Sequence, residues 1–124
     1  MPHIPPVRVL LVEDDAKLAM LLKRGLVESG MVVDAAATGE EALARVAADR
    51  FDVIVLDLLL PGIDGEEVFR RLRAQGNPAA VVILTAHWDL DDRGAVEAAD
   101  DFFPKPFSLE ELVARLRDLG AVAA

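Results

Sequence analysis

Short apolar runs alternate along the chain with longer segments in which apolar residues recur every three or four positions. The runs predict strands at residues 8–12, 31–35, 52–56, 80–84 and 101–104. The segments between them predict helices at 16–29, 66–74 and 89–99, with two more beginning after Thr38 and Ser108. Strands that alternate with helices in this way predict an α/β fold, a doubly wound five-stranded parallel sheet inside a three-layer sandwich with right-handed crossovers.

Local signals sharpen these boundaries. Gly30 follows the first helical segment, where a glycine commonly ends a helix. Thr38 and Ser108 are each followed three residues later by a glutamate, which is the capping-box pattern at a helix start. The run at 52–56 is apolar throughout its interior, so we expect it to be a central strand that is buried on both faces.

The length of 124 residues predicts a single domain with a proper core. Prolines make residues 1–7 an irregular N-terminal tail, and we expect the domain over 8–120, with 121–124 a C-terminal tail or the start of a linker. The chain has no cysteine, which excludes disulfides, thiolate metal sites and a cysteine nucleophile.

Charge and hydropathy narrow the class of partner. Thirteen basic and 22 acidic residues give a net charge of −9, so we expect no nucleic acid to bind this domain itself. The apolar runs are too short to span a bilayer, and the first residues lack the pattern of a signal peptide. We therefore expect a cytoplasmic protein without membrane contact.

Polar side chains follow four of the predicted strands at the point where each strand ends. Parallel strands bring their carboxyl ends to the same edge of a sheet, where α/β proteins bind their ligands. We therefore expect one crevice to hold these residues, which are Glu13, Asp14, Asp15, Asp57, Thr85 and Lys105.

This group suits a metal ion and a phosphoryl group. Asp15 is readily explained as a helix cap, whereas no helix begins close after Asp57. Acids gathered in one crevice repel each other, so a metal-free site should hold at least one raised pKa. Oxygen ligands with room for water favour Mg²⁺, and a phosphoryl group needs a metal, an ammonium and a hydroxyl around it.

Four sequence motifs together resemble the signature of two-component response-regulator receiver domains. They are LVEDD at residues 11–15, DLLLPGIDG at 57–65, LTA at 84–86 and KPF at 105–107. They occur in order and in register over residues 8–118, nearly the whole chain. The resemblance implies a flavodoxin-like sheet with strand order 2-1-3-4-5.

The resemblance also implies roles for residues at the acidic crevice. Asp57 is expected to accept a phosphoryl group from the phosphohistidine of a sensor histidine kinase. Asp14 and Asp57 would bind Mg²⁺ directly, Glu13 through water, and Leu59 through its backbone carbonyl. Such a domain is a phosphoacceptor with slow self-dephosphorylation and is not an enzyme in the usual sense.

The switching parts follow from the same resemblance. Lys105 would pair with one phosphoryl oxygen and Thr85 would hydrogen-bond another. Phe102, three residues before the lysine, occupies the aromatic switch position. The Lys105–Pro106 bond is expected to be cis, as in relatives.

The chain further resembles the winged-helix DNA-binding subgroup of this family, which dimerises through helix 4, strand 5 and helix 5. The matching charged residues are Arg93, Asp101, Glu111 and Arg115. A merely solvated charged surface is the alternative at these four positions. The subgroup implies a homodimer and a C-terminal DNA-binding domain in the parent protein.

The chain departs from the family pattern in two places. Thr85 and Lys105 lie 20 positions apart, about two fewer than is usual, and the loss falls between Gly94 and Ala99. Helix 4 should therefore be shortened, shifted or partly unwound. Leu59 and His87 occupy positions that tune attack by water in relatives, and we expect the apolar Leu59 to prolong the phosphorylated state.

Three other functions fit parts of the pattern. A carrier of flavin mononucleotide would need hydroxyls and glycines after the first strand, where this chain has acids. An aspartyl-phosphate phosphatase would need a second acid at the position of Leu59. A degenerate receiver that acts only as a docking module stays open, although the intact acids, threonine and lysine favour phosphorylation.

Overall fold

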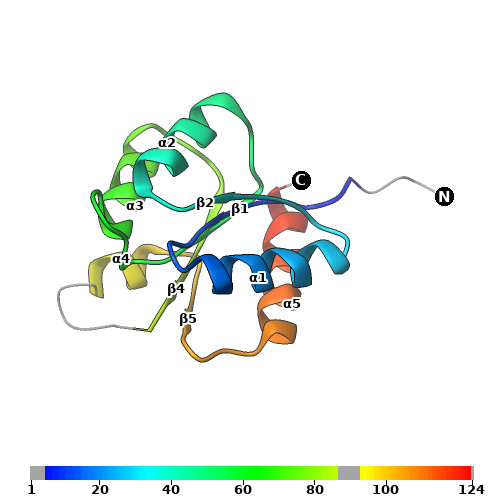
Figure 1. Cartoon of the computed structure of the whole chain (residues 1–124). Coiled ribbons are helices and arrows are strands. Elements are labelled where there is room, and N and C mark those ends of the chain that lie inside the picture. Colours follow the sequence, from blue (N-terminus) through cyan, green and yellow to red (C-terminus); the bar gives the residue numbers. More distant parts are fainter. Residues whose placement is uncertain (1–4, 87–92, 124) are drawn as a thin grey trace.

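The computed structural model describes residues 5–86 and 93–123, and ten helices and strands alternate along these ranges (Figure 1). In chain order they are β1 (Arg8–Val12), α1 (Ala16–Glu28), β2 (Val32–Ala36), α2 (Gly39–Ala48), β3 (Val53–Leu56), α3 (Gly65–Ala74), β4 (Ala80–Thr85), α4 (Arg93–Ala98), β5 (Asp101–Pro104) and α5 (Leu109–Ala123).

The sheet has the topology expected from the sequence. All strand pairs are parallel and the order is β2-β1-β3-β4-β5, which confirms the predicted doubly wound fold. Val12 of β1 lies opposite Leu56 of β3, and Thr85 of β4 lies opposite Pro104 of β5. The residues that follow these strands therefore leave the sheet at one edge.

Helices cover both faces of the sheet. Helices α1 and α5 lie on one face and α2, α3 and α4 on the other (Figure 1). Side chains of β1 alternate between the two cores, because Leu10 and Val12 pack with α2, α3 and α4 while Val9 and Leu11 pack with α1 and α5. Apolar strands buried on both faces are what the uninterrupted runs predict.

Capping side chains start the helices where the sequence indicated. The Glu41 N–H donates to Thr38 Oγ1 at 3.1 Å, and the Glu41 carboxylate in turn accepts the Ala37 N–H at 3.1 Å. The Glu111 N–H donates to Ser108 Oγ at 3.3 Å. Both predicted capping contacts are therefore present, with the return bond of Glu41 reaching one residue further back than the standard box.

Most predicted elements agree with the structure to within one residue at each end. The second strand begins at Val32, one residue later than expected, because the Met31 N–H still donates to Leu26 O in the closing turn of α1 at 3.1 Å. A helix was expected at 89–99, and the structure shows α4 over Arg93–Ala98. Residues 89–92 lie outside the described ranges. A shortened or shifted helix 4 therefore stays a prediction. Over the described ranges, every helix is too short or too polar to cross a membrane.

Candidate functional site

The carboxyl edge of the sheet gathers the buried polar groups of the described chain. Within the described ranges, three residues form the whole set of buried polar or charged residues: Glu13 after β1, Asp57 after β3 and Thr85 at the end of β4, with exposures of 2%, 4% and 1%. Burying a charged carboxylate is costly unless a partner compensates it. Their shared position at one edge therefore indicates a site rather than chance burial.

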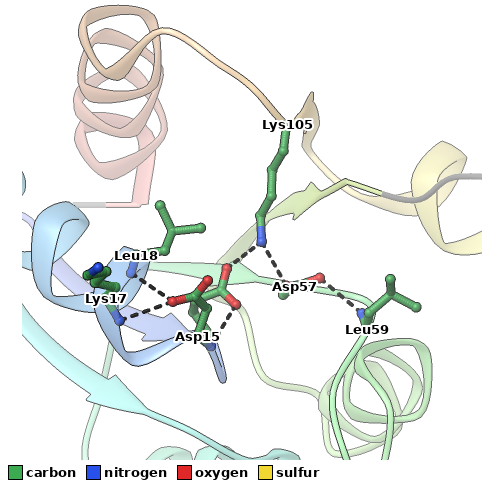
Figure 2. Close-up of polar contacts among 7 residues, drawn as sticks. Asp15, Lys17, Leu18, Asp57, Leu59 and Lys105 are labelled. Atoms are coloured by element: carbon green, nitrogen blue, oxygen red, sulfur yellow. Dashed lines mark hydrogen bonds and ion pairs between the residues drawn. The ribbon is translucent and has the colours of Figure 1, made fainter.

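Lys105 connects the two buried acids. Its Nζ lies 2.6 Å from Glu13 Oε1 and 3.0 Å from Asp57 Oδ2. In Figure 2 the Lys105 side chain extends from the segment after β5 toward Asp57. The second carboxylate oxygen of Asp57, Oδ1, accepts the Leu59 N–H at 3.0 Å. Both oxygens of the buried Asp57 are thus satisfied, and the carboxylate is held in one orientation.

Of the acids at this edge, Glu13 has a raised pKa. Burial is the main cause that raises the pKa of Glu13 to about 7, and the negative charge of Asp57 adds to it. The hydrogen bond from Lys105 opposes both effects. This raised pKa confirms the expectation that acids gathered without a metal ion would be strained.

The pKa of Lys105 is also raised, which for an ammonium group favours the charged form. Burial by itself would lower the pKa of Lys105, but hydrogen bonds to Glu13 and Asp57 and the charges of these acids outweigh it and raise the pKa above its usual value. The ammonium is therefore firmly charged, and it neutralises part of the carboxylate charge.

Three acids are placed to hold a cation. Carboxylate oxygens of Glu13, Asp14 and Asp57 lie within 4.8 Å of one another. Asp14 is exposed while the other two are buried, so the group opens to solvent on one side. An all-oxygen group with access to water suits Mg²⁺, which keeps several waters when it binds protein. The donor set therefore fits the expected metal, while the Leu59 carbonyl as a further ligand stays a prediction.

Asp15, the remaining acid of the cluster, has a different role. Its Oδ1 accepts the backbone N–H groups of Lys17 and Leu18 at 3.0 and 3.1 Å, which caps α1 (Figure 2). The Asp15 N–H in turn donates to Glu13 Oε2 at 3.2 Å. Asp15 therefore starts a helix and steadies Glu13, as the capping explanation of its sequence position predicted.

Close backbone contacts fix the loop that carries Asp57. The Asp57 N–H donates to Val12 O at 3.0 Å, and the Gly65 N–H donates to Leu58 O at 2.9 Å. A Cβ on Gly65 would lie 2.2 Å from Asp57 O and 2.6 Å from Leu58 Cα, so only glycine fits there. The sequence predicted this helix from residue 66 and did not reveal the requirement at Gly65, for which a glycine directly after Asp64, the cap of α3, was the available signal.

A contact from α2 reaches the same loop. Glu40 Oε1 accepts the Ile63 N–H at 2.9 Å, and this hydrogen bond is the main cause that lowers the pKa of Glu40. A Cβ on Gly39 would lie 2.7 Å from Ile63 O, so the start of α2 packs directly against the loop. Sequence reasoning gave no role to Glu40 or Gly39.

The segment after β5 is held to β4 beside the acids. The Lys105 N–H donates to Thr85 O at 2.9 Å. The Lys105–Pro106 peptide bond is cis, which confirms the expectation from the resemblance. Phe102 is half-buried against the core beneath α2, α3 and α4, and its switching role, like that of Thr85, stays a prediction.

The predicted dimer face is partly engaged within the chain itself. Arg115 Nε lies 2.7 Å from Asp101 Oδ2, and Arg115 Nη2 donates to Asp100 O at 3.4 Å. Glu111 is exposed, while the Arg93 side chain and all of His87 lie outside what the structure describes. Dimerisation through this face stays a prediction.

Comparisons with known proteins agree with this geometry. A family model described as the response regulator receiver domain matches residues 9–117. The response regulator MprA of Mycolicibacterium vanbaalenii is 46% identical over 116 residues, which cover 92% of this chain and 50% of that protein. The transcriptional regulatory protein TcrA of Mycobacterium tuberculosis is 50% identical over 119 residues, which cover 94% of this chain and 47% of that protein. The chain thus spans about half the length of these relatives.

A solved structure shares the fold. The response regulator protein TrrA of Thermotoga maritima, crystallised in complex with Mg²⁺ and BeF, superposes with a TM-score of 0.81 at 35% identity. The match covers 91% of this chain and 98% of that one.

Proposed function

This chain belongs to the response regulator receiver domains of two-component systems, and from that premise we propose that Asp57 is its phosphoacceptor. Response regulators receive their phosphoryl group from sensor histidine kinases. The observation that carries the proposal is a buried Asp57 carboxylate, held by the Leu59 N–H at 3.0 Å and by Lys105 Nζ at 3.0 Å, at the ligand-binding edge of the sheet.

Phosphotransfer would proceed as a nucleophilic displacement at phosphorus. A carboxylate oxygen of Asp57 forms the new P–O bond, while the P–N bond to the kinase imidazole breaks and its electron pair stays on the imidazole nitrogen. Oδ1 is bonded to a backbone N–H, that of Leu59, whereas Oδ2 is bonded to the side-chain ammonium of Lys105, which can transfer to a phosphoryl oxygen. We therefore expect Oδ2 to attack. A carboxylate attacks phosphorus with its own lone pair, so the step needs no general base.

Charge on the transferred group must be neutralised from several sides. A magnesium ion held by Glu13, Asp14 and Asp57 would supply positive charge to the phosphoryl oxygens. Lys105 supplies an ammonium as well, and its bond to Glu13 at 2.6 Å keeps it within reach of Asp57. Thr85, buried at the end of β4, would donate its hydroxyl to another phosphoryl oxygen.

Signalling would follow from a shift between two conformations. The phosphoryl group adds negative charge that Thr85 and Lys105 contact better in one arrangement than in the other, and only this difference can move the equilibrium. Phe102 would report the change to the surface of α4, β5 and α5, where Arg93, Asp101, Glu111 and Arg115 would form a homodimer. Because the intrachain pair of Asp101 and Arg115 would have to open or be shared, dimerisation would compete with it.

The output would be transcriptional. TcrA is called a transcriptional regulatory protein, and this chain matches about half of its length. We propose that a C-terminal DNA-binding domain accompanies this receiver in the parent protein. The receiver itself would not bind nucleic acid, given its net charge of −9.

Acetyl phosphate and Mg²⁺ provide the direct test. We expect intact-mass spectrometry to show the gain of one phosphoryl group in the native chain and in Asp118→Asn, an exposed aspartate on α5 that controls for loss of charge. Asp57→Asn should gain nothing under the same conditions. A native chain that stays at its unmodified mass, although folded and bound to Mg²⁺, would instead favour a docking module that works without phosphorylation.

Size-exclusion chromatography of the same samples tests the dimer separately. A shift to a dimer on phosphorylation in the native chain, lost in Glu111→Ala, would support the face proposed above. An unchanged elution volume after full phosphorylation would contradict it without affecting the assignment of Asp57.

A further inference from the structure

Three arginines without a carboxylate partner among the described residues lie close together. Side chains are described for nine of the ten arginines, Arg93 being the exception. Five of the nine pair with carboxylates, namely Arg24, Arg70, Arg71, Arg73 and Arg115. Within the described ranges, Arg8, Arg50 and Arg117 have no carboxylate partner, and all three line one cavity. Three uncompensated cations at one place are unexpected in a chain of net charge −9.

The cavity lies at the amino edge of the sheet, opposite the acidic site. Its volume is about 690 Å³, and segments distant in sequence surround it: the approach to β1, the turn after α1, the residues before β3 and the end of α5. Pro6, Val7 and Met31 give it an apolar wall. Pockets for small molecules commonly have this range of volume and a mostly apolar lining with a few polar groups.

Hydrogen bonds and close packing hold these segments together. The Arg8 N–H donates to Asp52 Oδ2 at 2.9 Å, and the Asp52 N–H donates to Arg8 O at 2.9 Å. Arg117 Nη2 donates to Ser29 O at 2.8 Å, which ties α5 to the turn after α1. A Cβ on Gly120 would lie 2.6 Å from Val7, so α5 packs closely on the approach to β1. The cavity is therefore preformed.

The arginines keep donors available to a ligand. The Arg8 guanidinium stacks on the Phe51 ring at 5.4 Å from its centroid, which orients the planar group without using its N–H bonds. Arg117 uses one nitrogen for Ser29, and Arg50 is exposed. Asp52 is the single acid in the lining, so three positive charges face one negative charge.

We propose that this cavity binds a small organic anion that carries a phosphate group. Guanidinium groups bind phosphate through paired N–H bonds and remain charged at all physiological pH values. The apolar wall provides contact for the organic part of such a molecule. The five residues of β1 separate the cavity from the acidic edge by roughly 16 Å, and Lys105 neutralises part of the charge at that edge, so its repulsion of an anion in the cavity is weak.

An amide-detected NMR titration of the native chain with adenosine monophosphate tests the proposal in magnesium-free buffer. We expect saturable shifts at Ser29, Gly30 and Arg117, with a dissociation constant between about 10 μM and 1 mM. Inorganic phosphate should shift the same signals more weakly because it lacks the organic part. Citrate, a polycarboxylate of greater negative charge, distinguishes phosphate recognition from simple charge attraction and should bind less tightly.

Two variants and a matched control locate the site. Arg50→Gln and Arg117→Gln should each weaken binding about fivefold or more, which is the loss of one charge-assisted contact. Arg45→Gln is the control, because it removes the same charge from α2, outside the cavity lining. Like the three arginines of the cavity, Arg45 has no ion-pair partner among the described residues. This substitution should leave the affinity unchanged. Amide spectra of the free variants establish that each is folded.

Several results would overturn the proposal. These are the absence of saturable shifts up to about 10 mM ligand, an equal loss of affinity in Arg45→Gln, and tighter binding of citrate than of the nucleotide. Shifts confined to Glu13, Asp57 and Lys105 would place the phosphate in the acidic site and would equally reject the cavity. None of these results bears on the assignment of Asp57 as phosphoacceptor, which the acetyl phosphate experiment decides.

Discussion

At the scale of single residues, Lys105 decides how two buried acids are tolerated. Its ammonium contacts Glu13 at 2.6 Å and Asp57 at 3.0 Å, and both carboxylates are almost fully buried. Removing one member of a buried ion pair leaves an uncompensated charge, whereas the complete group is tolerated. Lys105 therefore serves the metal-free fold as well as the phosphoryl group that we propose.

The raised pKa of Glu13 makes stability depend on pH. With a pKa of about 7 in the folded chain and 4.5 as its ordinary value, Glu13 binds a proton when folded that it releases on unfolding between these pH values. The unfolded state then binds fewer protons, so the free energy of unfolding falls as pH rises from 4.5 to 7, by about 3 kcal/mol for this group. Glu13→Gln should remove that fall.

Urea denaturation with EDTA at pH 5 and pH 8 measures this effect. We expect Glu13→Gln to gain stability relative to the native chain between the two pH values, whereas Glu110→Gln, an exposed control on α5, should follow the native chain. Parallel pH profiles for the native chain and Glu13→Gln would show that Glu13 titrates normally.

Leu59 should govern the lifetime of the phosphorylated state. Leu59 is 51% exposed and its N–H donates to Asp57 Oδ1 at 3.0 Å, and the resemblance places it at a position that tunes attack by water. An asparagine there could orient the water, and Leu59→Asn should shorten the phosphoaspartate half-life several-fold. Loss of phosphate mass after donor removal measures it. Val27→Asn, an exposed apolar control on α1, should keep the native half-life. An unchanged half-life in Leu59→Asn would count against this role.

At the scale of elements, the loop between β3 and α3 matters most because it carries Asp57. The loop is fixed by the Gly65 N–H on Leu58 O, by Asp64 as the cap of α3 and by Glu40 on the Ile63 N–H. Helix α2 therefore holds the same loop that carries Asp57, the proposed phosphoacceptor. The loop's conformation depends on contacts with two helices.

A pair of glycine substitutions tests this loop. Gly65→Ala would place a Cβ 2.2 Å from Asp57 O, and we expect a loss of about 3 kcal/mol because backbone must move. Gly94→Ala, on α4 with nothing within 4 Å of the added carbon, should instead gain up to about 1 kcal/mol from helix propensity. Thermal unfolding of both variants measures the contrast. Equal effects of the two substitutions would show that the close approach at Gly65 is unimportant.

At the scale of the whole molecule, charge is divided between the two edges of the sheet. The carboxyl edge holds Glu13, Asp14 and Asp57, and the amino edge holds Arg8, Arg50 and Arg117 around the cavity. The same two strands, β1 and β3, connect the edges. The metal ion that we expect and the anion that we propose would therefore bind at opposite edges of the sheet.

Magnesium should stabilise the whole domain through the acidic edge. A ligand that binds only the folded state adds RT ln(1 + [L]/Kd), about 2.7 kcal/mol when its concentration is 100 times Kd. We expect the midpoint of thermal unfolding to rise with Mg²⁺ in the native chain and in Asp118→Asn, and to stay constant in Asp14→Asn. Asp14 is chosen because it is exposed, so its loss should hardly disturb the fold. Equal magnesium responses in all three proteins would place the metal elsewhere.

Much of the fold follows from local pattern because strands buried on both faces must be apolar throughout, as the runs at β1, β3 and β4 are. The site was also accessible, since Asp57 and Lys105 directly follow predicted strands. Weaker parts had competing local explanations. Met31 looked like strand but closes the turn after α1, and Gly65 lay outside the predicted third helix but begins α3.

By itself the sequence determined the layers of this protein, the edge at which its acids gather and the residue expected to carry phosphate. Periodicity and strand ends are local properties, which one chain displays without reference to distant parts. Only the tertiary structure decided that Lys105 bonds Glu13 as well as Asp57, that Gly65 admits no side chain and that Arg8, Arg50 and Arg117 surround one cavity. Those facts depend on how segments distant in sequence pack together, and no local pattern encodes that packing.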